Sequence, residues 1–365
     1  MFTLIIGAVM QSQPLNAFWH IPWLKPLNDA QAWNRLVQTV HPLWSLTEIR
    51  AKVLRVVWEC NDVFSLYLKP NRLFKGFTPG QHIALQLELD GVRKARYFSL
   101  SNAVKGNGEL RLSIKINPAG SVSKAASLLK PGQIVRISQA SGSFASAPIE
   151  QALLLISAGS GITPMLSLLH SWSPLANKPK VVLVHSCQTA EQLILANELQ
   201  TLVHSWPELQ VLTHFSAEQG RLSIEQIAQW VPDIAERTTL LCGPVPFMAM
   251  IQSYFEQHGL SHQLEQEFFG QLNFSADPNA EQFTVFNADA QASFDAKNGQ
   301  SLLEAAESAG LKPKHGCRRG ICMSCQCKKI SGVVMNQLTQ IASSNDEEWI
   351  QLCVSTPLSN LQLEH

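Results

Sequence analysis

The stretch that decides the fold of the C-terminal third is residues 315–325, which read HGCRRGICMSC. Cys317, Cys322 and Cys325 stand in it at the spacing C-x4-C-x2-C, and Cys353 follows after 27 intervening residues. Three close cysteines and a distant fourth are the ligand spacing of a plant-type 2Fe-2S cluster. The sequence therefore predicts four thiolate ligands that converge on two irons.

Zinc and disulfide bonds are the alternative uses of these cysteines. Structural zinc sites usually space cysteines as two close pairs, whereas here three cluster and one is remote. Four of the eight cysteines fall within residues 317–327, which is unlike a disulfide framework and favours a reducing, cytoplasmic compartment. Cys327 is expected to be a strand residue beside the ligands, and Cys60 and Cys187 are expected to be inert buried thiols.

Length and composition limit the class of protein. The chain has 365 residues, enough for two or three domains of about 150 residues each. Basic and acidic residues both number 28, which excludes nucleic-acid binding through bulk positive charge. Hydrophobic residues make up 45%, which rules out disorder as the dominant state, and no apolar run approaches the ~20 residues needed to cross a bilayer. Residues 1–10 are apolar but hold no lysine or arginine, so no signal peptide is expected.

The residue pattern predicts five segments. Residues 1–47 hold four of the nine tryptophans and form either an arm that packs on the main body or a docking surface for a partner or a membrane. Residues 48–149 predict a small antiparallel barrel, and residues 150–272 predict an α/β unit. Residues 273–280 form a polar linker, and residues 281–365 hold strands, one helix and the cysteine loop.

The barrel is predicted from short β-branched and aromatic runs that are separated by turn signals. Asp90-Gly91 marks a two-residue hairpin turn between two of these runs. The predicted strands cover residues 53–58, 63–68, 82–89, 96–100, 110–116 and 134–137.

The next segment alternates strands with helices, which predicts a parallel sheet covered by helices. Residues 152–157 form a continuous apolar run, as in a strand buried on both faces. Helices are expected over residues 165–170, 191–202 and 247–258.

Two motifs follow strands of this sheet. Gly159-Ser-Gly-Ile-Thr-Pro164 opens a helix, so its backbone N–H groups suit a pyrophosphate; a plain tight turn is the alternative. Cys242-Gly-Pro244 ends another apolar strand. Because ligands gather at the carboxyl ends of parallel strands, both motifs are expected to face one crevice. For Cys242, a buried small thiol before a turn is the alternative.

Arg96-Tyr-Phe-Ser99 ends a predicted barrel strand. Arginine offers a forked donor to phosphate, and an aromatic residue two positions on lies on the same face of the strand. Ser99 can donate to a flavin ring nitrogen, and Gly120-Ser-Val-Ser123 can present backbone N–H groups to a pyrophosphate. An ordinary barrel strand with one exposed arginine is the alternative.

Together these motifs resemble the ferredoxin–NADP reductase superfamily, in particular the oxygenase- and desaturase-type reductases with a plant-type ferredoxin domain at the C-terminus. The resemblance covers residues 49–365, and the flavin, nicotinamide and cluster motifs appear in the family's order. It implies a barrel that binds flavin, a parallel-sheet domain that binds NAD(P)H, and a β-grasp α+β ferredoxin domain.

The resemblance also implies roles for single residues. Ser99, Cys242 and Glu267 would lie at the reacting atoms, and Glu267 with Phe268 matches the acidic-aromatic pair that closes the nucleotide domain over the flavin. The residues implied for the flavin are Arg96, Phe98, Ser99, Gly120, Val122 and Ser123. The residues implied for the nicotinamide dinucleotide are Gly159, Gly161, Thr163, Pro164, Cys242 and Gly243. The residues implied for the cluster are Cys317, Cys322, Cys325 and Cys353.

Two departures from the family's pattern concern the cofactors. Phe98 stands where the family usually has tyrosine, so the hydroxyl hydrogen bond to the flavin is lost. Users of NADPH often place an arginine after the second strand of the nucleotide domain, whereas His185-Ser-Cys-Gln-Thr189 has no fixed positive charge. Arg221 is the remaining candidate for a 2′-phosphate, and the balance favours NADH. FAD is the expected flavin, with FMN as the alternative.

The function implied by the resemblance is electron transfer from NAD(P)H through a flavin and a 2Fe-2S cluster to a partner protein. The expected partner is an oxygenase or a fatty-acid desaturase, with a membrane-bound desaturase as the first expectation because of the tryptophan-rich segment. A redox sensor without turnover and an oxidase that reduces oxygen are the rival interpretations. The nicotinamide motifs argue against a sensor, because a sensor needs no hydride donor.

Six basic residues surround the cysteine loop. They read either as solvated charge or as a surface that steers an acidic partner or this chain's own flavin domain. The six are Lys312, Lys314, Arg318, Arg319, Lys328 and Lys329.

Overall fold

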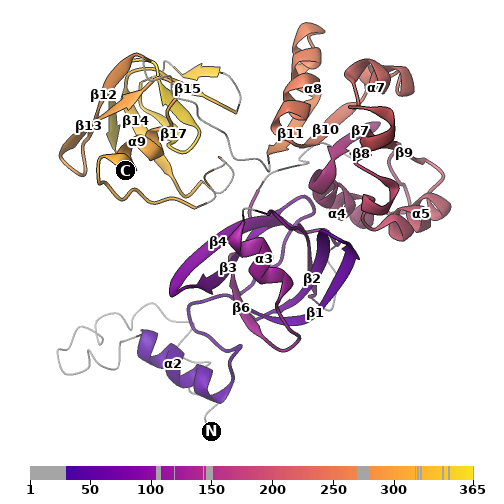
Figure 1. The fold of residues 1–365 in the computed structure, drawn as a ribbon, viewed down its shortest axis with the longest axis horizontal. Helices are drawn as coiled ribbons and strands as arrows, with labels where there is room; N and C mark the ends of the chain where they lie inside the picture. Colours follow the sequence, from indigo (N-terminus) through magenta and orange to yellow (C-terminus); the bar gives the residue numbers. More distant parts are fainter. Residues whose placement is uncertain are drawn as a thin grey trace.

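The computed structural model describes residues 30–103, 108–118, 120–142, 144, 151–268, 280–316, 318, 320, 323–338, 341–343 and 346–364. Helix α2 (Ala30–Val40) comes first, and three sheet-based units follow it along the chain. Figure 1 shows these units as a purple barrel, a magenta-to-orange α/β unit and a yellow-orange C-terminal unit. Their order and type confirm the fold class that the sequence predicted.

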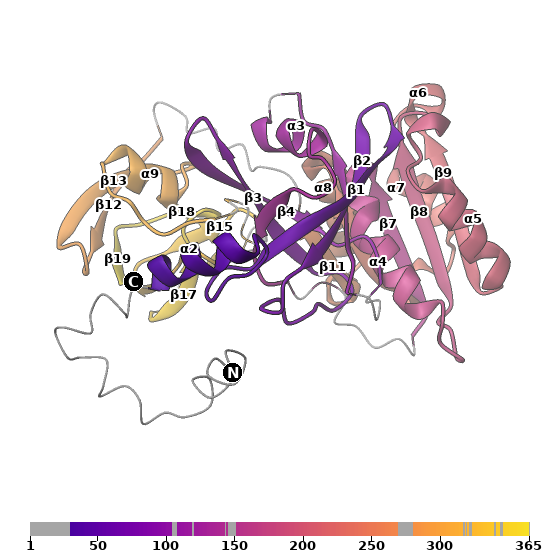
Figure 2. The same cartoon turned by 90° about the horizontal axis from the view of Figure 1, so that it is seen from below.

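The barrel is a six-stranded antiparallel sheet in the order β4-β3-β6-β1-β2-β5, and Leu100 bridges Leu112 to close it. Leu110, Leu112 and Ile114 face its interior, and because side chains alternate along a strand the residues between them face outward. In Figure 2, β1 crosses the barrel as a long arrow. The elements are β1 (Arg50–Cys60), β2 (Val63–Pro70), β3 (His82–Leu89), β4 (Val92–Ser99), β5 (Leu110–Lys115), α3 (Ser121–Ser127) and β6 (Ile134–Ile137).

The predicted turn at Asp90-Gly91 joins β3 to β4. Asp90 has a φ of 54° and Gly91 a φ of 72°, the two left-handed conformations that a type I′ turn requires. The register that starts at this turn ends with His82 opposite Ser99. The turn thus fixes which residue lies beside the predicted flavin serine.

The second unit is a sheet of five parallel strands in the order β11-β10-β7-β8-β9. Leu153 and Leu155 of β7 share a core with α4 and α5, while Leu154 and Ile156 share one with α7 and α8 on the other face (Figure 1). The order of strands reverses beside β7, which places a crevice at the carboxyl ends. The elements are β7 (Leu153–Ala158), α4 (Ile162–Trp172), β8 (Val181–Cys187), α5 (Ala196–Ser205), β9 (Leu209–Phe215), α6 (Ser216–Gln219), α7 (Ile224–Trp230), β10 (Thr238–Gly243), α8 (Val245–Gln257) and β11 (Leu264–Phe268).

One helix in this unit differs from the prediction over residues 191–202. The structure has a short 3₁₀ turn at Ala190–Gln192, and α5 begins only at Ala196. Leu195 has a φ of 57°, a left-handed conformation that a continuous right-handed helix cannot include. Tertiary packing explains the break, because Ile194 and Leu195 are both buried in the core.

The C-terminal unit is a mixed five-stranded sheet with one helix against it and a small three-stranded sheet beside it. β12 and β19 run parallel and the other pairs antiparallel, which is the expected β-grasp arrangement. The elements are β12 (Gln282–Asn287), β13 (Ala292–Lys297), α9 (Leu302–Ser308), β14 (Gln326–Ser331), β15 (Val334–Asn336), β16 (Ile341–Ser343), β17 (Glu348–Gln351), β18 (Ser355–Pro357) and β19 (Leu361–Glu364).

The residues after α2 are tied to the start of the barrel. The buried Asn34 amide donates to Oγ1 of Thr47 at 2.6 Å, and Arg50 Nη1 donates to the Pro42 carbonyl at 2.8 Å. Pro42 therefore contacts the first strand of the barrel, while Trp33 and Trp44 are exposed, and the choice between a packed arm and a docking surface stays a prediction; residues 1–29 lie outside the described part of the chain. Among the described helices, none combines the length and the apolar character that a bilayer span requires.

Candidate functional site

A cavity of about 380 Å³ opens where the barrel meets the nucleotide unit. The end of β4 and the start of α3 line it from the barrel, and Ser160 lines it from the loop before α4. Seven of the predicted site residues also line it, and they are Arg96, Phe98, Ser99, Gly120, Val122, Ser123 and Thr163. The structure thus brings the predicted flavin residues and part of the nucleotide motif to one cavity.

The start of α3 is held open toward this cavity. Gly120 caps the helix, and its own N–H donates to the Asn117 carbonyl at 2.8 Å, so that donor is already used. Ser123 Oγ accepts from the Asn117 N–H at 3.1 Å, which fixes the loop before the helix. The N–H groups of the first turn have no partner within the helix. They are therefore the donors of the predicted Gly120–Ser123 motif that suit a phosphate here, whereas the Gly120 N–H is not.

A buried carboxyl group lies next to the predicted flavin serine. Glu267 at the end of β11 is 5% exposed, and its Oε1 is 3.1 Å from Nδ1 of His82 on β3. His82 Nε2 lies 3.1 Å from Ser141 Oγ, so both ring nitrogens have partners. Burial raises the pKa of Glu267 above its ordinary value, while the His82 contact and the nearby Ser99 hydroxyl oppose that rise.

Two polar atoms beside the cavity are left without partners. Within the described residues, neither Ser99 Oγ nor Glu267 Oε2 has a hydrogen-bond partner of normal geometry, although both are buried. Buried polar atoms are nearly always satisfied, so this pair fits the polar edge of a flavin ring. His82 was not predicted from the sequence; the hairpin register that sets it opposite Ser99 is the signal that points to it.

A second cavity of about 220 Å³ lies at the carboxyl ends of β7, β8 and β10. Gly159 lines it, together with Ser186, Gln188 and Pro244 from the neighbouring strand ends. Ser160 lines both cavities, so the two sites adjoin. This is the crevice that the two nucleotide motifs predicted.

Gly161 explains why the glycine loop and the Cys242 motif meet. A Cβ on Gly161 would lie 2.1 Å from the Cys242 carbonyl oxygen, so only glycine allows this approach. Cys242 itself is fully buried and lines neither cavity. Burial raises the pKa of its thiol well above the ordinary value, and the Glu267 charge adds to that. In the structure Cys242 is therefore a neutral buried thiol before a turn, which is the alternative that the sequence left open.

Lys115 at the end of β5 is a site residue that the sequence did not reveal. It lines both cavities, and its Nζ lies 3.2 Å from Asp62 Oδ2. Strand alternation puts it on the outward face of β5, toward the nucleotide unit. Its ammonium group is therefore placed where the phosphates of either ligand would pass.

In the predicted cluster loop, Cys325 and Cys353 are described and both are buried; Cys317 and Cys322 lie outside the described residues. The Gly320 N–H donates to Cys353 Sγ at 3.3 Å, which is the kind of backbone contact that a cluster sulfur receives. Gly320 has a φ of 74°, and a Cβ there would lie 2.6 Å from Leu338. No group of three or more possible metal ligands occurs within the described residues.

Cys327 behaves as the sequence predicted for a strand residue. It lies on β14, is 1% exposed and belongs to the core of the C-terminal unit. Burial and the nearby Cys325 raise the pKa of its thiol to about 12.

The prediction that six basic side chains surround the cysteine loop at the surface is wrong in part. Lys329 is fully buried, and its Nζ donates to the Gly332 carbonyl at 2.9 Å. Arg318 pairs with Glu307, and Lys328 Nζ lies 3.0 Å from Glu347. Lys312 and Lys314 are exposed, and Arg319 lies outside the described residues. Local ion pairs and the strand register, which sequence spacing does not show, therefore take up three of the six charges.

Family models match the three units in order. The oxidoreductase FAD-binding domain matches residues 53–145, the oxidoreductase NAD-binding domain matches residues 155–253, and the 2Fe-2S iron-sulfur cluster binding domain matches residues 285–358.

Similar proteins share this arrangement over most of their length. An NADPH oxidoreductase of Mycobacterium tuberculosis is 32% identical over 330 residues, covering 89% of this chain and 86% of that protein. A glycine betaine monooxygenase reductase subunit of Chromohalobacter salexigens is 27% identical, covering 86% and 93%. The solved structure of phthalate dioxygenase reductase has a TM-score of 0.59 and 20% identity, covering 87% of this chain and 98% of that one. The last likeness shows a shared fold.

Proposed function

Because the chain belongs to the ferredoxin–NADP reductase family, in the type with a C-terminal 2Fe-2S domain, we propose that it takes electrons from NADH and delivers them singly to a partner oxygenase. It is an NAD(P)H-dependent oxidoreductase with FAD and a 2Fe-2S cluster as its cofactors. The observation that carries the proposal is the shared cavity, since Arg96 and Ser99 of the barrel line it together with Thr163 of the nucleotide unit.

When bound, FAD accepts the two electrons of a hydride and releases them one at a time, which matches the capacity of a 2Fe-2S cluster. We assign Arg96 and the first turn of α3 to the flavin phosphates, because forked guanidinium and helix N–H donors suit an anion. Phe98 supplies an aromatic face within the cavity. The nucleotide unit supplies Ser160 and Thr163 to the wall of the same cavity.

Ser99 and Glu267 are the groups placed to handle a proton at the flavin edge. Glu267 is buried with a raised pKa, so its carboxyl holds a proton more readily than an exposed one. His82 Nδ1 lies 3.1 Å from Oε1, Oε2 has no partner of normal geometry among the described residues, and the nearby Ser99 hydroxyl acts to lower the pKa of this carboxyl. These side chains can exchange a proton without admitting bulk water.

The route through the cluster is tested by Cys353→Ser against Cys327→Ala as a matched control. Anaerobic addition of NADH should reduce the flavin in both variants. Cytochrome c reduction should fall at least about tenfold in Cys353→Ser, because a lost thiolate ligand removes the cluster, and should persist in Cys327→Ala. Equal rates in both variants would remove the cluster from the route. A wild-type protein that neither NADH nor NADPH reduces would favour a redox sensor.

The preference for NADH is supported by the second cavity. Among the residues that line it, Lys115 is the only cation, and it is paired with Asp62. Arg221 is exposed and is not among the residues lining either cavity. Values of kcat/KM for both nucleotides should favour NADH, and a preference for NADPH would contradict the assignment.

The acceptor is proposed to be an oxygenase component, because several relatives are reductase subunits of monooxygenases. A membrane-bound fatty-acid desaturase is the alternative, and the exposure of Trp33 and Trp44 at 41% and 55% favours it. Flotation with anionic lipid vesicles distinguishes the two. Binding that a Trp33→Ser, Trp44→Ser double variant abolishes would support the desaturase, and no binding by wild-type protein would support an oxygenase.

A further inference from the structure

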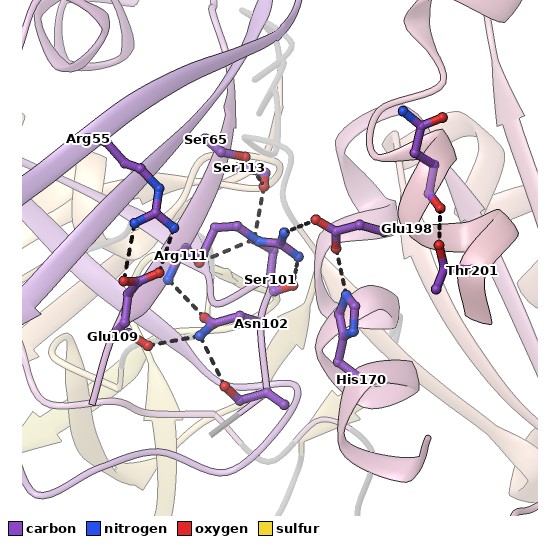
Figure 3. A network of polar contacts seen from close by, with 12 residues as sticks. Arg55, Ser65, Ser101, Asn102, Glu109, Arg111, Ser113, His170, Glu198 and Thr201 are labelled. Carbon is purple, nitrogen blue, oxygen red and sulfur yellow. Dashed lines mark hydrogen bonds and ion pairs between the residues drawn. The ribbon is translucent and has the colours of Figure 1, made fainter. Parts of the chain in front are cut away.

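The outward face of β5 is covered by the nucleotide unit. Arg111 lies on this face, between Leu110 and Leu112 of the barrel core, yet only 4% of its surface is exposed. An arginine that points away from its own domain is buried here because α4 and α5 lie against it (Figure 3). The interface between the two domains therefore contains a buried charged group, the Arg111 guanidinium.

Arg111 is anchored first within the barrel. Its Nη2 donates to the Ser101 carbonyl at 2.5 Å, and its Nε donates to Ser101 Oγ at 3.1 Å. Its backbone N–H donates to Oδ1 of Asn102 at 2.8 Å. These contacts hold the guanidinium in one orientation, with Nη1 directed at the nucleotide unit (Figure 3).

Glu198 of α5 completes the contact from the other domain. Its Oε1 accepts from Arg111 Nη1 at 2.6 Å, and its Oε2 lies 2.7 Å from Nε2 of His170 at the end of α4. Burial alone would raise the pKa of Glu198, but the bonds from His170 and Arg111 outweigh it and lower the pKa to about 2. The carboxylate is therefore ionised throughout the physiological pH range. It bonds to β5 through Arg111 and to α4 through His170.

A second contact runs beside this one. Ser167 Oγ, on the same helix as His170, donates to the Asn102 carbonyl at 2.9 Å. The first contact joins β5 to α5 and, through His170, to α4, whereas the second joins Asn102 to α4 directly. Two contacts at separate points of the interface fix an angle as well as a distance.

The elements that are joined are the ones that carry the two cavities. Ser113 and Lys115, further along the outward face of β5, line both cavities. Thr163, at the start of α4, lines the larger one. Ser113 Oγ lies 2.9 Å from Ser101 Oγ, and Ser101 Oγ accepts a hydrogen bond from Arg111 Nε. A chain of hydrogen bonds therefore runs from the cavity wall to the domain interface.

We propose that Arg111, Glu198 and His170 are positioning residues that set the orientation of the nucleotide domain on the barrel, and so the approach of the nicotinamide to the flavin. The proposal rests on the function proposed above. An intact buried ion pair contributes little net stability because desolvation offsets its attraction, although deleting one partner destabilises the protein by leaving the other charge unpaired. A misplacement of about 1 Å, by contrast, can slow a reaction about a hundredfold. The contact should therefore matter more for the rate than for folding.

The test uses Glu198→Ala and Glu198→Gln in the full-length holoprotein, with Glu236→Gln as control. Glutamine removes the negative charge but keeps an acceptor for Arg111, and its amide can donate to His170 once the imidazole adopts the other tautomer, whereas alanine removes both contacts. Glu236 is an exposed glutamate of the same domain that precedes β10, at the edge of the sheet opposite the cavities. Stopped-flow reduction by NADH gives the rate, and titration with NAD⁺ gives the affinity.

Glu198→Ala should slow flavin reduction by about tenfold to a hundredfold with little change in NAD⁺ affinity or flavin content, and Glu198→Gln should restore most of the rate. The control should match the wild type. An unchanged rate in Glu198→Ala, or a loss that follows nucleotide affinity, would overturn the proposal. Equal damage by alanine and glutamine would assign the effect to charge alone and would also overturn it.

Amide hydrogen exchange gives a readout that does not depend on turnover. In Glu198→Ala, peptides covering residues 99–103 and 166–172 should exchange faster, because the interface opens, while peptides covering β8 should not change. Unchanged exchange at the interface would contradict the assigned contact. A wild-type protein that no nucleotide reduces would defeat the proposed function, an outcome distinct from a working enzyme that tolerates Glu198→Ala.

Discussion

Ser99 shows how one residue is placed for a ligand rather than for the folded chain. Its hydroxyl is buried and has no partner of normal geometry within the described residues. Leaving such a group unsatisfied costs about 1–3 kcal/mol. That cost is offset when a flavin presents a polar atom to it. His82 and Lys115 differ from Ser99, because both already have partners within the folded chain.

Ser99→Ala should therefore separate stability from activity. In flavin-free protein the change should leave the free energy of unfolding equal or raise it by up to about 1 kcal/mol, because an unsatisfied group is removed. In the holoprotein the rate of flavin reduction by NADH should fall by about tenfold or more. Urea unfolding and stopped-flow absorbance measure the two effects. A clear loss of stability in the flavin-free variant would show that the hydroxyl already has a structural partner.

At the scale of elements, the nucleotide site depends on how closely one helix approaches one strand. The loop before α4 rests on the end of β10, with Gly161 against the Cys242 carbonyl. Gly159 differs, because it has a φ of 55° but nothing within 4 Å of an added Cβ. Glycine is required at position 161 because a Cβ would clash with the strand, and it is favoured at position 159 because the backbone there is left-handed.

Gly161→Ala and Gly159→Ala form a matched pair. Gly161→Ala should destabilise the protein by about 3 kcal/mol and abolish NADH binding, because a Cβ would displace the helix from the strand. Gly159→Ala should cost only about 1–2 kcal/mol, the strain of a left-handed alanine. Thermal unfolding and NAD⁺ titration test the pair. Similar behaviour of the two variants would contradict the close approach.

At the scale of the whole molecule, the hydrophobic cores show which units are mechanically coupled. Val63 and Phe144 of the barrel belong to the core that contains α4 and α5, so the barrel and the nucleotide unit share buried surface. The C-terminal core, around Leu302 and Val354, contains residues of that unit alone. The barrel and the nucleotide unit are thus joined through a common hydrophobic core, whereas the C-terminal unit has a core of its own.

Calorimetry of the holoprotein should accordingly show two transitions. The barrel and the nucleotide unit should unfold together, and the C-terminal unit should unfold separately. Removal of iron by a chelator under reducing conditions should lower only the second transition, because the lost metal–thiolate bonds stabilise that unit. A single transition that shifts as a whole would contradict separate cores.

The sequence by itself determined the units and their order. Motif spacing predicted Cys317, Cys322, Cys325 and Cys353 as cluster ligands, and strand–loop–helix context predicted the glycine loop, because such signals are local in the chain. Only the tertiary structure decided which charges are used inside the protein and which residues meet across domains. Lys329 is buried and Arg111 pairs with Glu198 through strand register and domain docking. Contacts between residues that are distant in sequence depend on the packing of whole elements, which no local pattern specifies.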